Sequence, residues 1–341
     1  MRNSGTTQAR PTMRDVAALA GVGTMTVSRV LSGSVPVSEE TRTRVEQAIA
    51  ALHFRPNEVE RSLREARTRS IGIIVPEISD PFFALCAQAA SEAAKEHAYS
   101  FMMTTSEEDP ETEYAEANRM LRRHVEGLIV IPAANGVSRL TEPEFASIPI
   151  VAIDRPLRGS HCSTVLVENK RGARLAVQHL IDHNHRHIAF LGLSDKLFTL
   201  NARRAAYVET MELAGLVPEV YPNCATQQET LDLLRGLQQS GRLPTALFLA
   251  NHPVMQFVLH ALQLLRIRVP ETVALIGFDD FELAELVQPA VTVVRQPREE
   301  LGRVAAALLF ERLQAIGTPA RATRRILPVE LIVRRSCGCT P

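Results

Sequence analysis

One short stretch of the sequence, TMTVSR at residues 24–29, combines small hydrogen-bonding side chains with one guanidinium. An apolar spacing that starts at Val27 and continues at Val30 and Leu31 predicts a helix here. The side chains left on its outward face are those of Thr24, Met25, Thr26, Ser28 and Arg29. Such a face suits the base edges and phosphates of a DNA major groove, and the alternative is an ordinary helical hairpin on a protein surface.

A second set of chemically capable residues follows the apolar runs in the rest of the chain. They stand where predicted buried strands end, at residues 80–83, 154–155, 201–203, 251–252 and 279–280. In open parallel sheets, ligands bind beyond the carboxyl ends of the strands. The aromatic pair Phe82-Phe83, together with these polar and charged groups, would equip a cleft for a small polyhydroxylated or anionic molecule.

Three predicted helices position the first set. Val16, Leu19 and Ala20 form the apolar face of a helix that ends before Gly21. Gly21 suits a helix C-cap with positive φ, so the chain can turn sharply into the second helix. A third helix follows Ser38, a suitable N-cap. Its apolar stripe consists of Val45, Ala48, Ile49 and Leu52.

From residue 70 onward, apolar strands alternate with amphipathic helices. The predicted strands cover residues 70–76, 100–105, 127–132, 148–154, 164–168, 187–192, 245–251 and 273–280. The predicted helices cover residues 82–98, 110–124, 137–146, 169–183, 200–214, 226–240 and 253–265. This alternation predicts parallel sheets with helices on both faces, divided into two lobes because one sheet would be too large. We expect the remaining segments, 292–316 and 324–335, to cross between the lobes.

Charge is unevenly distributed along the chain. The first 70 residues contain 11 Arg, no Lys and 7 acidic residues, whereas the remainder has 27 basic and 31 acidic residues. A basic head on a mildly acidic body fits a nucleic-acid-binding module attached to a sensor or an enzyme. The segment 56–69 is polar and rich in Arg, which is typical of a solvated linker or of a helix that forms only against a partner.

The length of 341 residues predicts two or three domains, and a hydrophobic content of 45% is typical of a globular protein with a sizeable core. The sequence has no long apolar run and no apolar N-terminal segment, so we expect a cytoplasmic protein with no membrane span. Five cysteines are present, and only Cys337 and Cys339 lie close together. We predict no metal site, because these two thiols have no further partner at metal-ligand spacing. The His-rich turn at 182–187 does not change this prediction, since its side chains point in different directions.

Two other protein classes are disfavoured by missing features. The sequence has no G-x-x-x-x-G-K-[ST] loop, no G-x-G-x-x-G after the first strand and no G-x-S-x-G elbow, so we predict neither an enzyme nor a cofactor. A plain solute-binding protein would need an export signal and no basic head.

Several motifs occur in one order along the chain. The head carries DVAxxAGV from Asp15, TVSRVL from Thr26, VS at 37–38 with TR at 41–42, and RPN at 55–57. The body carries SIGIIVPEISDPFFA, VEGLIV, VxIDRP, HRHIAFLG, IGFDD and LPVELIVRRS. With these motifs the chain resembles the LacI/GalR family of bacterial transcriptional repressors over nearly its whole length. The resemblance implies an all-α helix-turn-helix head and a hinge. A two-lobed periplasmic-binding-protein-like (type I) sensor body of parallel doubly wound sheets would follow.

The resemblance also implies which residues bind. The second helix would enter the major groove, and the hinge would fold on DNA with Leu63 wedged into the minor groove. The DNA contacts it implies come from Thr12, Thr24, Met25, Thr26, Ser28, Arg29, Asn57, Leu63 and Arg64. The effector contacts it implies come from Phe82, Phe83, Asp154, Arg155, Arg203, His252 and Asp279.

His252 departs from the pattern of the family, which usually has an aspartate here that grips sugar hydroxyls. An imidazole that can be cationic, with Arg155 and Arg203 nearby, favours an anion, so we expect a sugar acid before a neutral sugar. The alternative is that His252 only packs, which leaves the effector open, including a purine or a corepressor. A second departure lies in the hinge, where Glu58 and Glu60 would face phosphates.

We therefore predict a DNA-binding head at 1–55 and a hinge at 56–69. The N-terminal lobe would comprise 70–166 with 297–323, and the C-terminal lobe 167–296 with 324–341. The expected partners are a palindromic operator DNA, a small-molecule effector (sugar acid or sugar) and a second copy in a homodimer. The chain has no heptad tail that would tie dimers into tetramers.

Overall fold

The computed structural model describes residues 11–32, 35–54, 68–133, 138–159, 162–194, 196–315 and 322–339. They form two compact units, one ending at Thr68 and the other starting at Arg69. Within these ranges, no helix combines the length and the apolar character that crossing a membrane requires.

The first unit is a bundle of three helices. These are α1 (Met13–Ala20), α2 (Thr24–Ser32) and α3 (Glu39–Ala51). Gly21 ends α1 with a φ of +65°, the left-handed conformation that its sequence position predicts. The apolar core holds Val16, Ala17, Ala20, Val27, Val45, Ala48 and Phe54. The prediction that Leu19 belongs to this core is wrong, because α1 turns the face containing Ala17 inward and leaves Leu19 57% exposed.

The second unit contains two six-stranded sheets. The first has the order β11-β5-β4-β3-β1-β2, with all strands parallel. Its strands are β1 (Ser70–Val75), β2 (Ser100–Thr105), β3 (Gly127–Val130), β4 (Ile150–Ile153), β5 (Ser163–Val167) and β11 (Arg324–Leu327). The second has the order β12-β10-β9-β8-β6-β7, and only its edge strand β12 runs antiparallel. Its strands are β6 (Ile188–Leu191), β7 (Glu219–Tyr221), β8 (Ala246–Leu249), β9 (Ala274–Phe278), β10 (Thr292–Arg295) and β12 (Glu330–Ile332).

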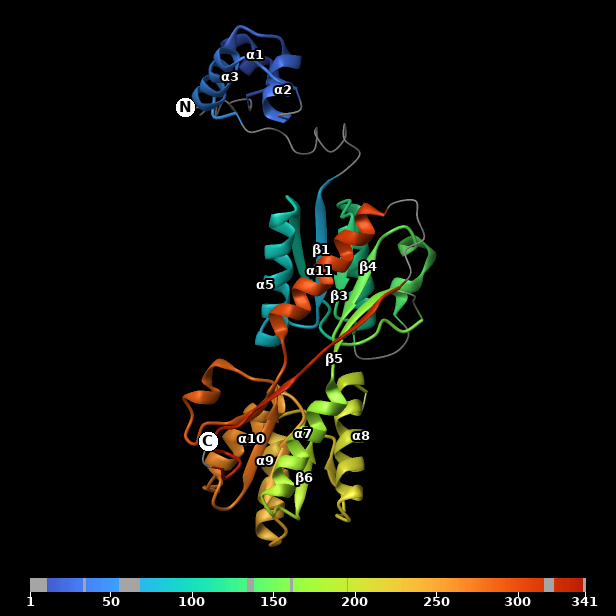
Figure 1. The fold of residues 1–341 in the computed structure, drawn as a ribbon, viewed down its shortest axis with the longest axis vertical. Coiled ribbons are helices and arrows are strands. Elements are labelled where there is room, and N and C mark those ends of the chain that lie inside the picture. The colour runs from blue at the N-terminus through green and yellow to red at the C-terminus, as the bar shows by residue number, and fades with distance from the viewer. Residues whose placement is uncertain are drawn as a thin grey trace, which may run out of the picture. The chain divides into compact units, whose positions relative to one another are not determined.

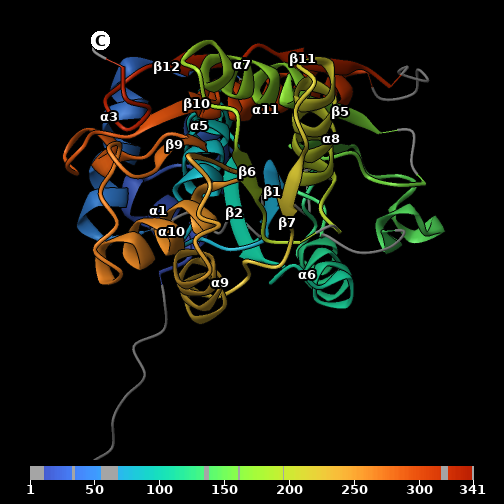
Figure 2. The ribbon, with the colours of Figure 1, turned by 90° about the horizontal axis from the view of Figure 1, so that it is seen from below.

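Helices cover both faces of each sheet, which confirms the predicted doubly wound architecture. The first sheet is covered by α5 (Pro81–Glu96), α6 (Pro110–Arg122) and α11 (Arg298–Gln314), and together they form the first lobe. The second sheet is covered by α7 (Asn169–Asp182), α8 (Phe198–Leu213), α9 (Gln227–Gln239) and α10 (His252–Leu264), which form the second lobe. Figure 1 shows α5 and α11 packed side by side over the first sheet. In Figure 2, α7 and α11 lie on one side of the sheets, with α6 and α9 on the other.

The chain crosses between the lobes three times. It passes from β5 into α7, from β10 into α11, and from β11 into β12. The last crossing corrects one predicted boundary, because β11 pairs with β5 and therefore belongs to the first lobe. The prediction that residues 324–341 all belong to the second lobe is therefore wrong for Arg324–Leu327.

Two other segments differ from the prediction. The expected helix at 137–146 is replaced by two short 3₁₀ helices, Arg139–Thr141 and Pro143–Phe145, because Pro143 has no N–H with which to continue a helix. Strand β7 was not predicted, since its three residues are all only partly buried and show no apolar alternation.

Candidate ligand cavity and nucleic-acid interface

A cavity of about 630 Å³ lies at the carboxyl ends of the strands of both sheets. Residues that follow β1, β4, β6, β8 and β9 line it, so both lobes contribute. Its apolar lining includes Phe82 and Phe83 from α5 and Phe257 from α10, together with Leu197 and Leu200. A cavity of this size, with an apolar wall and a few convergent polar groups, fits a small molecule.

Two aspartates occupy equivalent places in the two lobes. Asp154 follows β4, and its N–H donates to Val165 O on β5 at 2.9 Å. Asp279 follows β9, and its N–H donates to Val294 O on β10 at 2.9 Å. Both residues have positive φ, 66° and 83°, a conformation that costs non-glycine residues energy and that clusters at binding sites. Both side chains line the cavity, so each lobe presents one carboxylate.

Arg155 is paired within the protein. Its two terminal nitrogens donate to the Glu108 carboxylate at 2.8 Å each, and its Nε lies 3.5 Å from Asp154. Burial alone would lower the pKa of Arg155, but the bidentate bond to Glu108 raises it. The guanidinium therefore stays charged, and its charge is already balanced before any ligand enters.

Arg203 is held even more firmly. Its Nε donates to Asn169 Oδ1 and its terminal nitrogen to Ala250 O, both at 2.8 Å, and that nitrogen lies 3.8 Å from Asp279. The guanidinium carbon lies 3.6 Å from the centre of the Phe278 ring. Burial lowers the pKa of Arg203, and the nearby carboxylates oppose that effect. This side chain can donate to a ligand from a fixed position.

Asp80 also lines the cavity. It belongs to the predicted strand-end group at residues 80–83, although the resemblance implies no effector contact from it. It caps α5 by accepting a hydrogen bond from Phe82 N at 2.8 Å. Burial, followed by the negative charge of Asp279, raises its pKa to about 7. The cavity thus contains a carboxyl group that titrates near neutral pH.

The described residues that line the cavity carry more negative than positive charge. The acidic ones are Glu77, Asp80, Glu107, Glu108, Asp154 and Asp279, and the basic ones are Arg155 and Arg203. Oxygen acceptors therefore outnumber cationic donors, which opposes the binding of an anion and suits ligand hydroxyl groups.

His252 does not have the place expected for it. It begins α10, but it is not among the described residues that line the cavity. Its ring packs 5.2 Å from that of Phe281, and only its backbone N–H reaches toward the site, donating to Asp279 at 3.3 Å. Burial lowers the pKa of His252, so the imidazole is uncharged near neutral pH. The structure therefore agrees with the packing alternative and not with a cationic group in the cavity.

The structure brings together six of the seven predicted effector residues, which are Phe82, Phe83, Asp154, Arg155, Arg203 and Asp279. Asp80 and Asn251 also line the cavity, and both belong to the predicted strand-end groups at 80–83 and 251–252, although neither is among the effector contacts that the resemblance implies. Sequence reasoning missed Glu108, Phe257 and Gln296. Gln296, which donates to Asp279, and Glu108 lie in connecting segments with no comparable signal.

The predicted DNA-reading face lies on α2. Met25 is 69% exposed, Thr24 and Arg29 are exposed, and Thr26 and Ser28 are half-buried. Thr12 is the N-cap residue of α1, and its N–H and its hydroxyl both donate to Asp15 Oδ2 at 2.7 Å. The remaining predicted DNA contacts, Asn57, Leu63 and Arg64, lie outside the described residues.

Comparisons with known proteins agree with this anatomy. The family described as bacterial regulatory proteins, lacI family, matches residues 12–57, and the periplasmic binding protein-like domain matches residues 177–337. The HTH-type transcriptional repressor PurR of Pasteurella multocida (strain Pm70) is 30% identical, over 95% of this chain and 98% of its own. The ribose operon repressor of Escherichia coli (strain K12) is 32% identical, over 89% and 93%.

Solved structures show the same likeness. The lac repressor dimer bound to operator and the anti-inducer ONPF has a TM-score of 0.84 at 24% identity, covering 96% of this chain and 99% of its own, which is evidence of a shared fold. The complex of the transcriptional regulator CelR with cellobiose has a TM-score of 0.68 at 31% identity, covering 96% and 100%.

Proposed function

Because the chain belongs to the LacI family of bacterial regulatory proteins and is a transcriptional repressor, we propose that its cavity binds a neutral, polyhydroxylated effector of the monosaccharide class. The observation that carries this proposal is the charge of the cavity, where six carboxyl side chains face two guanidiniums already paired within the protein. Carboxylates accept hydrogen bonds from sugar hydroxyls, and the aromatic rings of Phe82, Phe83 and Phe257, which line the same cavity, can cover the C–H face of a sugar ring.

The sugar acid preferred from the sequence is less well supported. That preference rested on a cationic His252 in the cavity, whereas the imidazole is uncharged and packs against Phe281. A ligand carboxylate would also meet the negative charges of Asp154 and Asp279. The names of two relatives, a ribose operon repressor and a regulator bound to cellobiose, fit the neutral class.

The position of the cavity supports a mechanism for release from DNA. Asp154 belongs to the first lobe, and Arg203 and Asp279 belong to the second, so a ligand that binds all three favours the closed arrangement of the lobes. In a homodimer this closure would shift the subunit interface and weaken the binding of the hinge to the operator. The coupling needed is about 1–3 kcal/mol, a roughly 5- to 150-fold change in operator affinity.

The head would read one half-site of a palindromic operator. In this proposal the exposed face of α2 enters the major groove, and the two heads of a dimer lie about one helical turn apart, or a multiple of it. The residues proposed to contact DNA are Thr12, Thr24, Met25, Thr26, Ser28, Arg29, Asn57, Leu63 and Arg64.

An operator-shift titration tests the proposal. Genomic fragments that the protein retards would be titrated with neutral pentoses and hexoses, with the matching sugar acids, and with purines. We expect a neutral sugar to change operator affinity, and Asp154→Asn and Asp279→Asn to abolish this change while operator binding without ligand persists. The exposed control Asp232→Asn should respond like the wild type.

Two results would contradict the proposal in different ways. A response to sugar acids or purines alone would refute the neutral-sugar assignment. If no fragment is retarded under any condition, the assignment of α2 as the DNA-reading helix fails.

A further inference from the structure

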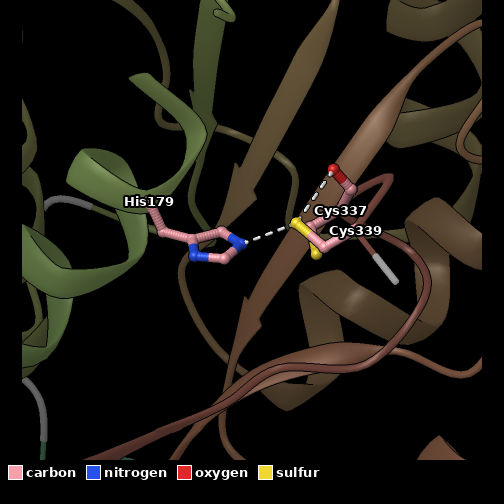
Figure 3. Close-up of side chains that lie close together, drawn as sticks. All are labelled: His179, Cys337 and Cys339. Carbon is pink, nitrogen blue, oxygen red and sulfur yellow. Dashed lines mark hydrogen bonds between the residues drawn. The ribbon is translucent and has the colours of Figure 1, made fainter. Parts of the chain in front are cut away.

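Three side chains from distant parts of the sequence converge in the second lobe. They are His179, on α7, and Cys337 and Cys339, in the segment that follows β12. Figure 3 shows the imidazole pointing toward the two sulfur atoms. One ligand atom from each residue lies within 4.8 Å of the other two, and His179 Nε2 is 3.1 Å from Cys339 Sγ. This arrangement supplies the third ligand that the CGC sequence lacks.

The local backbone makes the two thiols converge. Gly338 has a φ of +84°, and its N–H donates to Arg335 O at 3.1 Å, so the chain turns between the cysteines. A residue with a side chain rarely adopts this conformation, which explains the glycine at the centre of the motif. The turn directs both sulfur atoms toward α7.

The turn is also anchored to the second sheet. Ser336 Oγ donates to Leu275 O at 2.7 Å and accepts from Thr292 N at 2.8 Å, while Thr292 Oγ1 donates to Cys337 Sγ at 3.2 Å. Cys337 is buried, and Cys339 and His179 are half-buried. The three ligand atoms are therefore positioned by the fold and remain within reach of an ion from solution.

We propose that His179, Cys337 and Cys339 bind one thiophilic d¹⁰ metal ion, zinc or copper(I). Two thiolates and an imidazole are soft and borderline ligands that these ions prefer. In a tetrahedral site with bonds of about 2.0–2.3 Å, the ligand atoms lie about 3.5–3.8 Å apart, so small side-chain movements suffice. Zinc would keep a fourth position for water, whereas copper(I) would be satisfied by three ligands.

Metal ions bind cysteine in its thiolate form. An ion at this place would therefore displace the protons of Cys337 and Cys339 as it binds.

His183 is close to this site without belonging to it. Its ring packs at a tilt against that of His179 with centroids 4.3 Å apart, and its Nδ1 lies 2.7 Å from His179 O. Among the described residues, the cluster of possible metal ligands consists of His179, Cys337 and Cys339 and does not include His183. His183 therefore serves as the matched control for His179.

Metal binding would fasten the end of the chain to α7. This helix begins at Asn169, whose side chain orients Arg203 in the ligand cavity. An ion at His179 would therefore stabilise the helix that carries Asn169. Metal binding at this place does not depend on the effector proposed above, and it can be measured without sugar or DNA.

The test uses the full-length protein, reduced and stripped of metal by a chelator. Cobalt(II) is titrated first, because thiolate ligands give a charge-transfer band and a tetrahedral site gives intense visible bands. Zinc is then used to displace cobalt, and copper(I) is measured in competition with a chromogenic chelator. We expect one ion per chain and a rise in melting temperature on binding.

The variants identify the ligands. Cys337→Ser and Cys339→Ser should abolish the charge-transfer band, and His179→Gln should weaken binding by more than the roughly 10- to 100-fold that loss of an outer-shell partner causes. The controls His183→Gln and Cys162→Ser should bind like the wild type, and far-ultraviolet circular dichroism reports whether each variant is folded.

Several results would overturn the inference. One is binding of less than one ion per chain. A second is binding that persists unchanged in folded Cys337→Ser and Cys339→Ser. A third is a reduced protein that binds no ion and instead forms a Cys337–Cys339 disulfide in air, which would identify the pair as a redox site.

Discussion

Asp80 should make the stability of the sensor body fall as the pH rises toward neutrality. Its pKa in the folded protein is about 7, against an ordinary value of 3.8. Between these two values the folded protein holds a proton that the unfolded chain releases, so a rising pH favours unfolding. The penalty is complete above pH 7 and absent below about pH 4.

The magnitude follows from the two pKa values. A difference of about 3 corresponds to about 4 kcal/mol, since each pKa unit is worth 1.36 kcal/mol. Asp80 is half-buried, so solvent screening should reduce this to between about 1 and 3 kcal/mol. Asp80→Asn removes the ionisable group while keeping an oxygen that can cap α5 through Phe82 N.

The measurement is urea unfolding of wild type and Asp80→Asn at pH 5, 6, 7 and 8, followed by far-ultraviolet circular dichroism. The free energy of unfolding of the variant, minus that of the wild type, should increase with pH by about 1–3 kcal/mol over this range. A difference that stays constant within about 0.5 kcal/mol across the four pH values would refute the reasoning.

Three further predictions concern binding and packing. Arg203→Lys keeps the charge but loses the two hydrogen bonds to Asn169 and Ala250, so the free energy of unfolding in urea should fall by about 2–3 kcal/mol. The effector should also no longer release this variant from the operator, and release as in the wild type would contradict the role assigned to Arg203. Gly302→Ala places a methyl group 2.2 Å from Cys86 O between α5 and α11 and should destabilise the protein by about 1–3 kcal/mol or more. The control Gly236→Ala on α9 meets nothing within 4 Å and should stabilise the protein by about 0.5–1 kcal/mol. Equal effects of the two variants in thermal melts would show that the α5–α11 contact is not tight. Arg29→Ala should weaken the dependence of operator affinity on salt concentration by the amount expected for the loss of about one phosphate contact. Met25→Ala should change which operator sequences are bound most tightly. If neither variant differs from the wild type in binding assays, α2 does not read the operator.

Much of the fold could be predicted from the sequence because its strands are buried on both faces. Such strands read as continuous apolar runs, as in SIGIIV at 70–75 and ALIGF at 274–278. The segments between them show apolar residues at the 3.6-residue spacing of helices. The edge strand Glu219–Tyr221 lacks this signal because it is only partly buried. The place of β11 was also not predictable, because a short exposed strand after the last helix can pair with either sheet.

The binding site was predictable where it follows from topology and not where it depends on side-chain direction. Asp154 and Asp279 were found because the carboxyl ends of parallel strands meet at one edge. The bond between Arg155 and Glu108 joins two connecting segments, and it balances a guanidinium that was expected to attract an anionic ligand. His252 also follows a strand, but its side chain turns toward Phe281, which no sequence spacing specifies.

The three crossings between the lobes have a consequence for how the chain is made. The first lobe lacks its covering helix α11 and its edge strand β11 until residues 298–327 have been synthesised, after all the helices of the second lobe. At about 5–20 residues per second, residue 327 follows residue 167 by roughly 8–30 s. During this time the edge of β5 and the face of α5 that receives α11 have no partner from their own lobe. Nascent chains of this protein should therefore need protection by chaperones until their last helix and strands arrive.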